Sequence, residues 1–276
     1  MSQSAPEKSN EAAPFSGSVP ENYDRFLGPM LFQPYAADLV ERISVLDDGA
    51  VLEIACGTGI VTRRLRDCLS PSTKLVASDL NEAMMDFARK KFRATEGVEW
   101  RQADAAALPF AAETFDAVIC QFGLMFVPEK GAAMRETKRV LKPNGAFVFN
   151  VWDSLAHNEF TRIAHETVGQ FFDDDPPAFY HIPFGYHDRA AIRAELQEAG
   201  FRDVQMTELA LTSRSLSAAA AARGLVEGSP IVVAIVKRDA AALPRVRDAV
   251  ADVLRSRFGD GAIQGQMRAL VFAARA

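Results

Sequence analysis

Short apolar runs rich in β-branched residues alternate with segments of helical periodicity from residue 50 onward, and this alternation limits the fold more than any other feature. Apolar residues at period two predict strands, whereas apolar residues three and four positions apart predict helices. Strands that alternate with helices form βαβ units, which place the strands parallel in one sheet. The strands predicted in this part of the chain cover residues 51–55, 74–78, 98–102, 115–121 and 146–152.

The remaining sequence adds strands with longer helical connections. Asp188 is expected to cap a helix that ends at Gly200, and residues 204–211 are predicted to form a sixth strand. Helices are predicted near residues 216–226 and 241–258, before a last strand at 267–274. The chain is therefore expected to be an α/β protein with a doubly wound sheet of seven strands.

The N-terminal segment has a different composition. Its first 20 residues are rich in Ser, Pro and Ala and lack the basic-then-apolar order of a signal peptide. Apolar residues return from Glu21, interrupted by Pro29 and Pro34, which predicts a short turn and then a helix packed on the domain. We therefore predict a disordered tail over residues 1–20 and a single domain over residues 21–276.

Charge and cysteine content narrow the class of partner. The chain has 31 basic and 36 acidic residues, a net charge of -5, which does not favour nucleic acid or an anionic membrane. Cys56, Cys68 and Cys120 are too scattered for a disulfide framework or a metal site, which suits a reducing cytoplasm. No stretch reaches the roughly 18 apolar residues that span a bilayer. A cytoplasmic protein with a small-molecule partner is expected, and the oligomeric state stays open, a homodimer included.

A glycine loop and two acids follow successive predicted strands. Gly57 and Gly59 lie between the first strand and a helix, where backbone N–H groups can face a ligand. Asp79 ends the second strand and Asp104 the third, positions where carboxylates can accept ribose hydroxyls and an adenine amine. Each residue alone is more simply a turn glycine or a helix cap, but together they predict a nucleotide-type site. A dinucleotide fingerprint would have a third glycine where this chain has Thr62, which weakens an oxidoreductase interpretation.

These residues resemble the class I S-adenosylmethionine-dependent methyltransferases, in the branch of the quinone-biosynthesis enzymes often called type 11. The similar motifs are V-L-E-I-A-C-G-T-G at 51–59, S-D-L-N-E-A-M at 78–84, A-D-A-A-A-L-P-F at 103–110, F-D-A-V at 115–118 and R-V-L-K-P-N-G at 139–145. They follow the family's order and spacing. The family usually has glycine at the position of Ala55, which adds only a methyl group.

The resemblance implies a Rossmann-like sheet of order 3-2-1-4-5-7-6 with strand 7 antiparallel, and S-adenosylmethionine as the cofactor. It implies in-line methyl transfer to a small-molecule acceptor. Residues 155–187 and about 213–240 are predicted to form a helical cap or insert segments of the domain. Two alternatives remain at this point. One is a domain that binds S-adenosylmethionine without catalysis, and the other is an NAD(P)-dependent oxidoreductase.

The resemblance also assigns cofactor contacts. It implies that Gly57 and Gly59 lie under the methionine part and that Glu53 fixes its amino end, directly or through water. Asp79 would hold the ribose and Asp104 the adenine edge, while an N-terminal tyrosine would close over the cofactor or equally well anchor the first helix. Met84 also fits a core-filling role. The expected cofactor residues are Tyr23, Glu53, Ala55, Gly57, Gly59, Asp79, Leu80, Met84, Asp104, Ala105, Gln121 and Phe122.

Methyl transfer from a sulfonium depends chiefly on proximity and alignment, so a dedicated nucleophile is unnecessary. A general base would help if the acceptor is a hydroxyl or a carbon activated as a phenolate. All four histidines fall within 31 residues after the fifth strand, among many aromatic residues, which predicts an acceptor pocket there. The candidates for a catalytic role are His181, Tyr180 and His157, and the alternative is a pocket that works by proximity alone.

Overall fold

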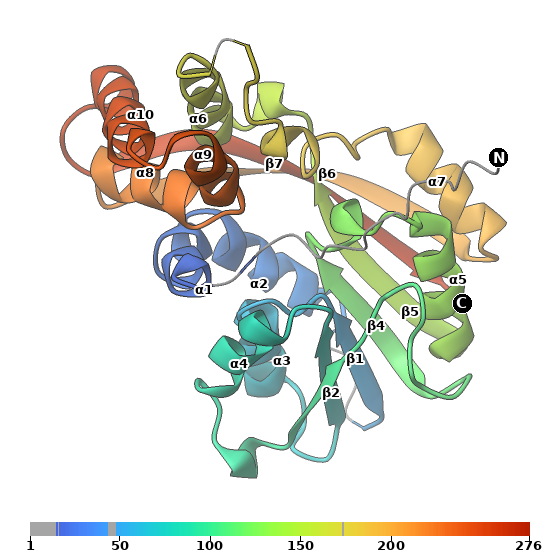
Figure 1. Ribbon diagram of the computed structural model, residues 1–276. Helices are drawn as coiled ribbons and strands as arrows, with labels where there is room; N and C mark the ends of the chain where they lie inside the picture. Colours follow the sequence, from blue (N-terminus) through green and yellow to red (C-terminus); the bar gives the residue numbers. More distant parts are fainter. Residues whose placement is uncertain (1–14, 16, 44–47, 173) are drawn as a thin grey trace, which may run out of the picture.

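The computed structural model describes residues 15, 17–43, 48–172 and 174–276 of the chain (Figure 1). Within this part, one seven-stranded sheet has the order β3-β2-β1-β4-β5-β7-β6. The pairs from β3 to β5 are parallel, and β7 runs antiparallel to both β5 and β6. The doubly wound fold and the strand order are confirmed. The strands are β1 (Ala50–Ile54), β2 (Lys74–Asp79), β3 (Val98–Gln102), β4 (Phe115–Gln121), β5 (Leu141–Trp152), β6 (Arg202–Ser215) and β7 (Ile263–Arg275).

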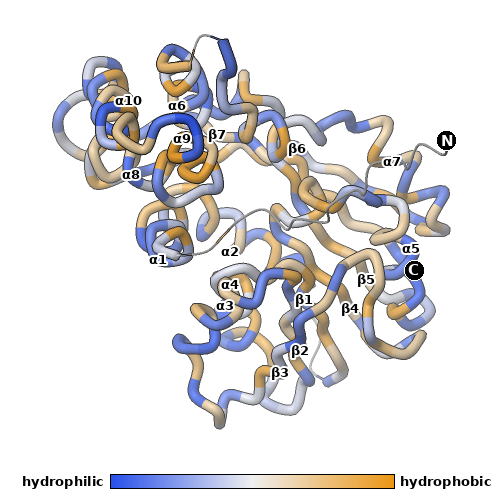
Figure 2. Tube along the Cα trace, in the orientation of Figure 1, coloured by the Kyte–Doolittle hydropathy of each residue, from blue (hydrophilic) through white to orange (hydrophobic). Residues whose placement is uncertain are grey.

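Helices cover both faces of this sheet because its strands are apolar on both sides. Val51 belongs to a core with α2 (Gln33–Glu41) and α3 (Ile60–Cys68), whereas the next residue, Leu52, belongs to the opposite core. That second core includes α5 (Lys130–Val140) and α7 (Arg189–Glu198). Apolar residues accordingly concentrate along β1, β4 and β5 in Figure 2. Successive residues of a strand are thus buried in the cores on opposite faces of the sheet.

The last strands are longer than the sequence pattern predicted. Residues 143–145, which precede the predicted fifth strand, lie inside β5, where Asn144 has a φ of 65° and the register with β4 shifts. β6 and β7 pair from Arg202 with Arg275 to Ser215 with Ile263. Much of β6 is polar or half exposed, so its hydrophobic pattern is weak, and its length follows from pairing with β7.

The N-terminal segment stays helical where a turn was expected. The chain passes from α1 (Val19–Asn22) through a π-helical segment η1 (Tyr23–Phe32) into α2. Pro34 lies in the first turn of α2, where a helix needs no N–H, and Pro29 lies in the wider π-helical turns. Both prolines therefore lie within continuous helical structure, and the predicted turn is not formed. The tail prediction falls largely on residues 1–14 and 16, outside the described part; α1 already begins at Val19.

Four helices gather beyond the end of the sheet, at the upper left of Figure 1. They are α6 (Glu159–Gly169), α8 (Ala218–Glu227), α9 (Ile231–Asp239) and α10 (Ala242–Phe258). Short 3-10 turns complete the fold: η2 (Ala94–Glu96), η3 (Leu124–Phe126), η4 (Leu155–His157) and η5 (Phe179–His181). In the described ranges no single helix has the length and apolarity to cross a membrane; only the pair α8 and α9, bent by 78°, meets that test on length and composition.

Candidate active site

The loop between β1 and α3 contains two glycines with left-handed backbone, Gly57 with φ 55° and Gly59 with φ 78°. A Cβ atom on Gly59 would lie 3.1 Å from the Cβ of Ala88 on α4 (Glu82–Arg89). Gly57 lines a cavity of about 870 Å³. Gly59 therefore lets two helices pack closely, and Gly57 lets the backbone approach a ligand.

Asp79 lies at the end of β2 and lines the same cavity. Its Oδ2 accepts a hydrogen bond from the N–H of Gly57, and its Oδ1 accepts one from the N–H of Asn81, both at 2.8 Å. Burial raises the pKa of the Asp79 carboxyl, and these hydrogen bonds oppose that rise. The carboxylate orientation is thus fixed by the backbone, which suits it to accept hydrogen bonds from a bound ligand.

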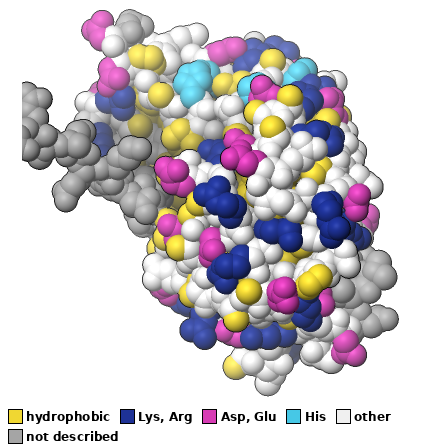
Figure 3. Space-filling view, turned by 90° about the vertical axis from the view of Figure 1, so that its right-hand side faces the viewer, with side chains coloured by type: hydrophobic (Ala, Val, Ile, Leu, Met, Phe, Trp, Pro, Cys, Tyr) yellow, Lys and Arg dark blue, Asp and Glu magenta, His cyan; other side chains and the backbone are white. Residues whose placement is uncertain are grey.

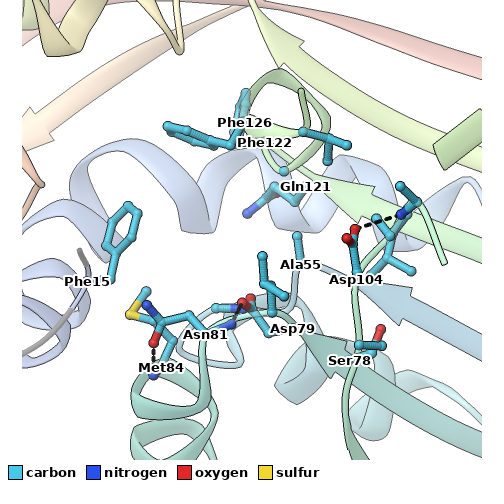
Figure 4. A pocket seen from close by; sticks show the side chains of 18 of the residues that line it. Phe15, Ala55, Ser78, Asp79, Asn81, Met84, Asp104, Gln121, Phe122 and Phe126 are labelled. Atoms are coloured by element: carbon cyan, nitrogen blue, oxygen red, sulfur yellow. Dashed lines mark hydrogen bonds between the residues drawn. The ribbon is translucent and has the colours of Figure 1, made fainter. Parts of the chain in front are cut away.

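Asp104 and Leu80 flank this cavity on the side of β3. The Oδ1 of Asp104 accepts a hydrogen bond from the N–H of Ala106 at 2.8 Å, which turns the chain after the strand. Leu80 is 40% exposed, an unusual position for a large apolar side chain. Figure 4 shows Asp79 and Asp104 near one another, with Phe122 and Phe126 on the other side of the cavity. An apolar surface beside a fixed carboxylate can bind a planar heterocycle.

Glu53 lies behind the glycine loop and is buried. The Thr62 hydroxyl donates a hydrogen bond to the Oε2 of its carboxyl group, at 2.5 Å. Burial raises the pKa of Glu53 to about 8, an effect that the Thr62 hydrogen bond opposes. Thr62, which departs from the dinucleotide fingerprint, therefore orients this carboxyl group.

Ala55 has a φ of 55°, a left-handed conformation that disfavours residues other than glycine by about 1–2 kcal/mol. Its methyl group faces Gly123, where an added Cβ would lie only 2.3 Å from the Ala55 Cβ. The end of β1 and the turn after β4 therefore touch. The family's usual glycine matches this backbone, and Gly123 leaves space for the methyl group that Ala55 carries.

Phe122 also has a left-handed backbone, with φ 51°. Its N–H donates to Asn150 on β5, to the side-chain Oδ1 at 3.0 Å and to the main-chain oxygen at 3.2 Å. Its ring stacks on Trp152, with centroids 3.8 Å apart and planes 8° apart. The neighbouring Gln121 donates from Nε2 to the Phe32 oxygen at 3.3 Å. The segment after β4 is thus attached both to β5 and to the N-terminal helices.

A second, smaller cavity of about 70 Å³ adjoins the first and is lined mainly by aromatic and aliphatic side chains. We call it the aromatic chamber. Four aromatic residues line both cavities: Phe15, Tyr23, Phe122 and Phe126. Burial raises the pKa of the Tyr23 hydroxyl. The other lining residues are Leu27, Leu31, Phe32, Met125, Trp152, Thr161, Phe179, Tyr180, Pro183, Phe184, Leu225 and Ser229.

Most residues expected at the cofactor line the large cavity, and Glu53 and Gly59 lie behind it. The aromatic wall residues Phe15 and Phe126 were not predicted from the sequence: Phe15 falls inside the predicted tail, and Phe126 follows β4 in an apolar segment. That apolar segment was the available signal for Phe126. The expected residues on the cavity wall are Tyr23, Ala55, Gly57, Asp79, Leu80, Met84, Asp104, Ala105, Gln121 and Phe122.

The three catalytic candidates are not brought together. Tyr180 lines the aromatic chamber, but its hydroxyl donates a hydrogen bond to the Leu225 oxygen at 2.8 Å. His181 and His157 are exposed, and neither lines either of these two cavities. The ring of His181 instead lies against His165, with centroids 4.8 Å apart.

Comparison with known proteins agrees with this geometry. A family profile described as a methyltransferase domain matches residues 52–149. The ubiquinone/menaquinone biosynthesis C-methyltransferase UbiE of Escherichia coli is 31% identical over 172 residues, 58% of this chain and 68% of UbiE. The YcgJ protein of Bacillus subtilis has a TM-score of 0.58 at 17% identity, over 88% of this chain and 98% of YcgJ. Phosphoethanolamine N-methyltransferase 2 of Haemonchus contortus, in complex with S-adenosyl-L-methionine, has a TM-score of 0.60 at 14% identity, over 95% and 57% of the two chains.

The sheet order, the glycine loop and the acids at the strand ends define an S-adenosylmethionine-dependent methyltransferase fold. The similarity to methyltransferases indicates a small-molecule substrate. The chain belongs to the class I family of these enzymes, in the UbiE-like branch. As in this family, its cofactor is S-adenosylmethionine. The oxidoreductase alternative is thereby set aside.

Proposed function

We propose that this enzyme transfers a methyl group in line from S-adenosylmethionine in the large cavity to a small acceptor in the aromatic chamber. When bound, S-adenosylmethionine supplies an activated methyl group and becomes S-adenosylhomocysteine after transfer. The observation that carries the proposal is the shared aromatic wall of Phe15, Tyr23, Phe122 and Phe126, because it places the two cavities in contact. Two ligands held there would be adjacent and oriented.

In this proposal the strand-end residues hold the cofactor. Asp79 accepts hydrogen bonds from the ribose hydroxyls, Leu80 packs on the adenine, and Asp104 with the backbone of Ala105 binds the adenine edge. Gly57 lies under the methionine part. Glu53, behind the loop, fixes the amino group of the methionine part directly or through water. The fixed Asp79 carboxylate and the volume of about 870 Å³ support these roles.

The acceptor part that enters the chamber should be uncharged and largely apolar. No charged side chain lies among the described residues that line it, and burying an unpaired charge is strongly unfavourable. The hydroxyls of Tyr180 and Ser229 both donate to the Leu225 oxygen, so they already have acceptors. Because His157 and His181 are exposed, we propose that proximity, rather than a histidine base, provides the catalysis.

We further propose one domain over residues 21–276, with the segments at 155–187 and about 213–240 as its cap. Phe179 and Tyr180 from the first segment and Leu225 from the second line the chamber together, which supports this division. On the face shown in Figure 3, basic and acidic side chains are interspersed, which fits a small-molecule partner rather than nucleic acid. A homodimer stays a proposal that mass measurement in solution can test.

The test of cofactor binding compares Asp79→Ala with Asp86→Ala, a control on α4 whose carboxylate pairs with Arg89 on the surface. Loss of charge-assisted hydrogen bonds to two hydroxyls should weaken S-adenosylhomocysteine binding at least tenfold in Asp79→Ala. The control should bind as the wild type does in calorimetry. Equal affinity of both variants would remove Asp79 from the site. Incubation of wild-type enzyme with radiolabelled S-adenosylmethionine and small-molecule extracts then identifies the methylated acceptor.

A further inference from the structure

Asn150 lies on β5 beside Gln121 of β4, in register with it, and has no exposed surface. It lines neither of the two described cavities. Its side-chain Oδ1 nevertheless accepts the N–H of Phe122, one of the four aromatic residues that both cavities share. Its influence on the site would therefore pass through Phe122.

The backbone of Phe122 needs such support. Its φ of 51° lies in the region that residues with a Cβ avoid, and such strain persists only where surrounding contacts enforce it. Asn150 is the contact at this point, because both hydrogen bonds from the Phe122 N–H go to this one residue. The stacked ring of Trp152 then fixes the side chain of Phe122.

The side-chain amide of Asn150 is energetically unfavourable at a buried position in the core. Its Nδ2 is buried and has no hydrogen-bond partner among the described residues, and a buried unpaired donor is unfavourable. An apolar residue of the same shape would avoid this penalty. A costly buried amide that enforces a strained backbone at the wall between two cavities indicates a role in the site rather than in stability.

We propose that Asn150 is a positioning residue that holds Phe122 in its left-handed conformation and thereby sets the aromatic wall between the cofactor cavity and the chamber. The proposal rests on the proposed function of these cavities. Without the Asn150 Oδ1, the Phe122 N–H keeps only its longer hydrogen bond to the Asn150 main-chain oxygen. Phe122 then relaxes toward an ordinary backbone conformation, and its ring leaves Trp152. Ligand binding then has to restore the strained conformation, which weakens affinity.

The test uses Asn150→Leu, which keeps the branched shape, and Asn150→Asp, which keeps the acceptor oxygen. Asn158→Leu is the matched control, because Asn158 is also buried, also accepts a backbone N–H, from Arg268 at 3.1 Å, and lines neither cavity. Calorimetry with S-adenosylhomocysteine should show about tenfold weaker binding in Asn150→Leu, and binding within about twofold of wild type in the other two variants. Melting temperatures report stability separately.

A second measurement, Trp152 fluorescence, reports on the position of the Phe122 ring in the aromatic wall. Trp100 and Trp152 are the two tryptophans of the chain, so a Trp100→Phe background leaves Trp152 as the reporter. Asn150→Leu should shift the Trp152 emission to longer wavelength as Phe122 leaves it, whereas Asn158→Leu should not. The proposal is overturned if Asn150→Leu and Asn158→Leu lower the melting temperature alike while affinity and emission stay at wild-type values. If wild-type enzyme itself fails to bind S-adenosylhomocysteine, the proposed function fails first.

Discussion

The two cavities differ in how their walls are built. The cofactor cavity is bounded largely by strand ends, where backbone N–H groups fix carboxylates such as Asp79. The aromatic chamber is bounded by side chains from η1, α6, η5 and α8, segments far apart in the sequence. A site built from short local motifs can stay constant while the neighbouring site, built from helix packing, takes a different ligand.

The largest expected effect tests whether the two regions are independent. Leu270 on β7 has no exposed surface and lies between Val151 of β5 and Glu208 of β6. Leu270→Asp buries an unpaired charge in the centre of the sheet and should unfold the whole protein. Circular dichroism and S-adenosylhomocysteine binding should both be lost, while Gln264→Asp, at an exposed position of β7, should keep both. Retained cofactor binding in Leu270→Asp would make the cofactor region an independent unit.

The next effect belongs to the cofactor side alone. The pKa of Glu53 is about 8 in the folded protein against 4.5 as its ordinary value, so the folded state holds a proton that the unfolded state has released between these values. The free energy of unfolding should therefore fall as pH rises from 5 to 8, by roughly 1 kcal/mol or more from this group. Glu53→Gln should flatten that slope in urea titrations. Glu99→Gln, on the partly exposed strand β3, should not; equal slopes in wild type and Glu53→Gln would show that Glu53 is ionised throughout.

A smaller effect belongs to the chamber side alone. Tyr180→Phe removes the hydrogen bond to the Leu225 oxygen and should lower the free energy of unfolding by about 1 kcal/mol. Because Tyr180 lines only the chamber, S-adenosylhomocysteine affinity should stay within about twofold. If the tyrosine hydroxyl acted as a base, Tyr180→Phe would also abolish methylation of the identified acceptor. We expect turnover to persist.

The smallest expected effect is on stability, at Ala55 beside the glycine loop. Ala55→Gly places glycine at a φ of 55° and should raise the free energy of unfolding by roughly 0.5–1 kcal/mol. Ala77→Gly on β2, a buried alanine outside the positive-φ positions, should lower it by a similar amount. Thermal melts of both variants check the prediction. A loss of stability in both would mean that the methyl contact with Gly123 outweighs the strain.

The sequence predicts the cofactor side well because its signals are local. Gly57, Asp79 and Asp104 occupy fixed places relative to the predicted strands, so position along the chain implies position in space. Even here the hydrogen bond between Thr62 and Glu53 is not visible in the sequence, because helical pitch alone does not show that a buried carboxyl lies opposite.

The chamber was predicted only in outline. The aromatic content of residues 155–187 marked a pocket, and Phe179, Tyr180 and Phe184 do line it. The histidines in the same segment carried no periodic signal that distinguishes an inward from an outward side, and two of them are exposed. Phe15 and the π-helical η1 were missed because the tertiary contacts of an N-terminal segment leave no local pattern.

The place of β7 between β5 and β6 has a consequence for synthesis on the ribosome. β6 is an edge strand whose described neighbour in the sheet is β7 alone, and α8, α9 and α10 lie between the two in the chain. When β6 has emerged from the ribosome, the strands β3, β2, β1, β4 and β5 can already be paired in a sheet. β6 has no partner at that stage, because β7 has not yet been synthesised. Such a chain exposes strand edges that invite pairing with other molecules, so pauses in translation between residues 215 and 263 should be the most aggregation-prone moments in the protein's production.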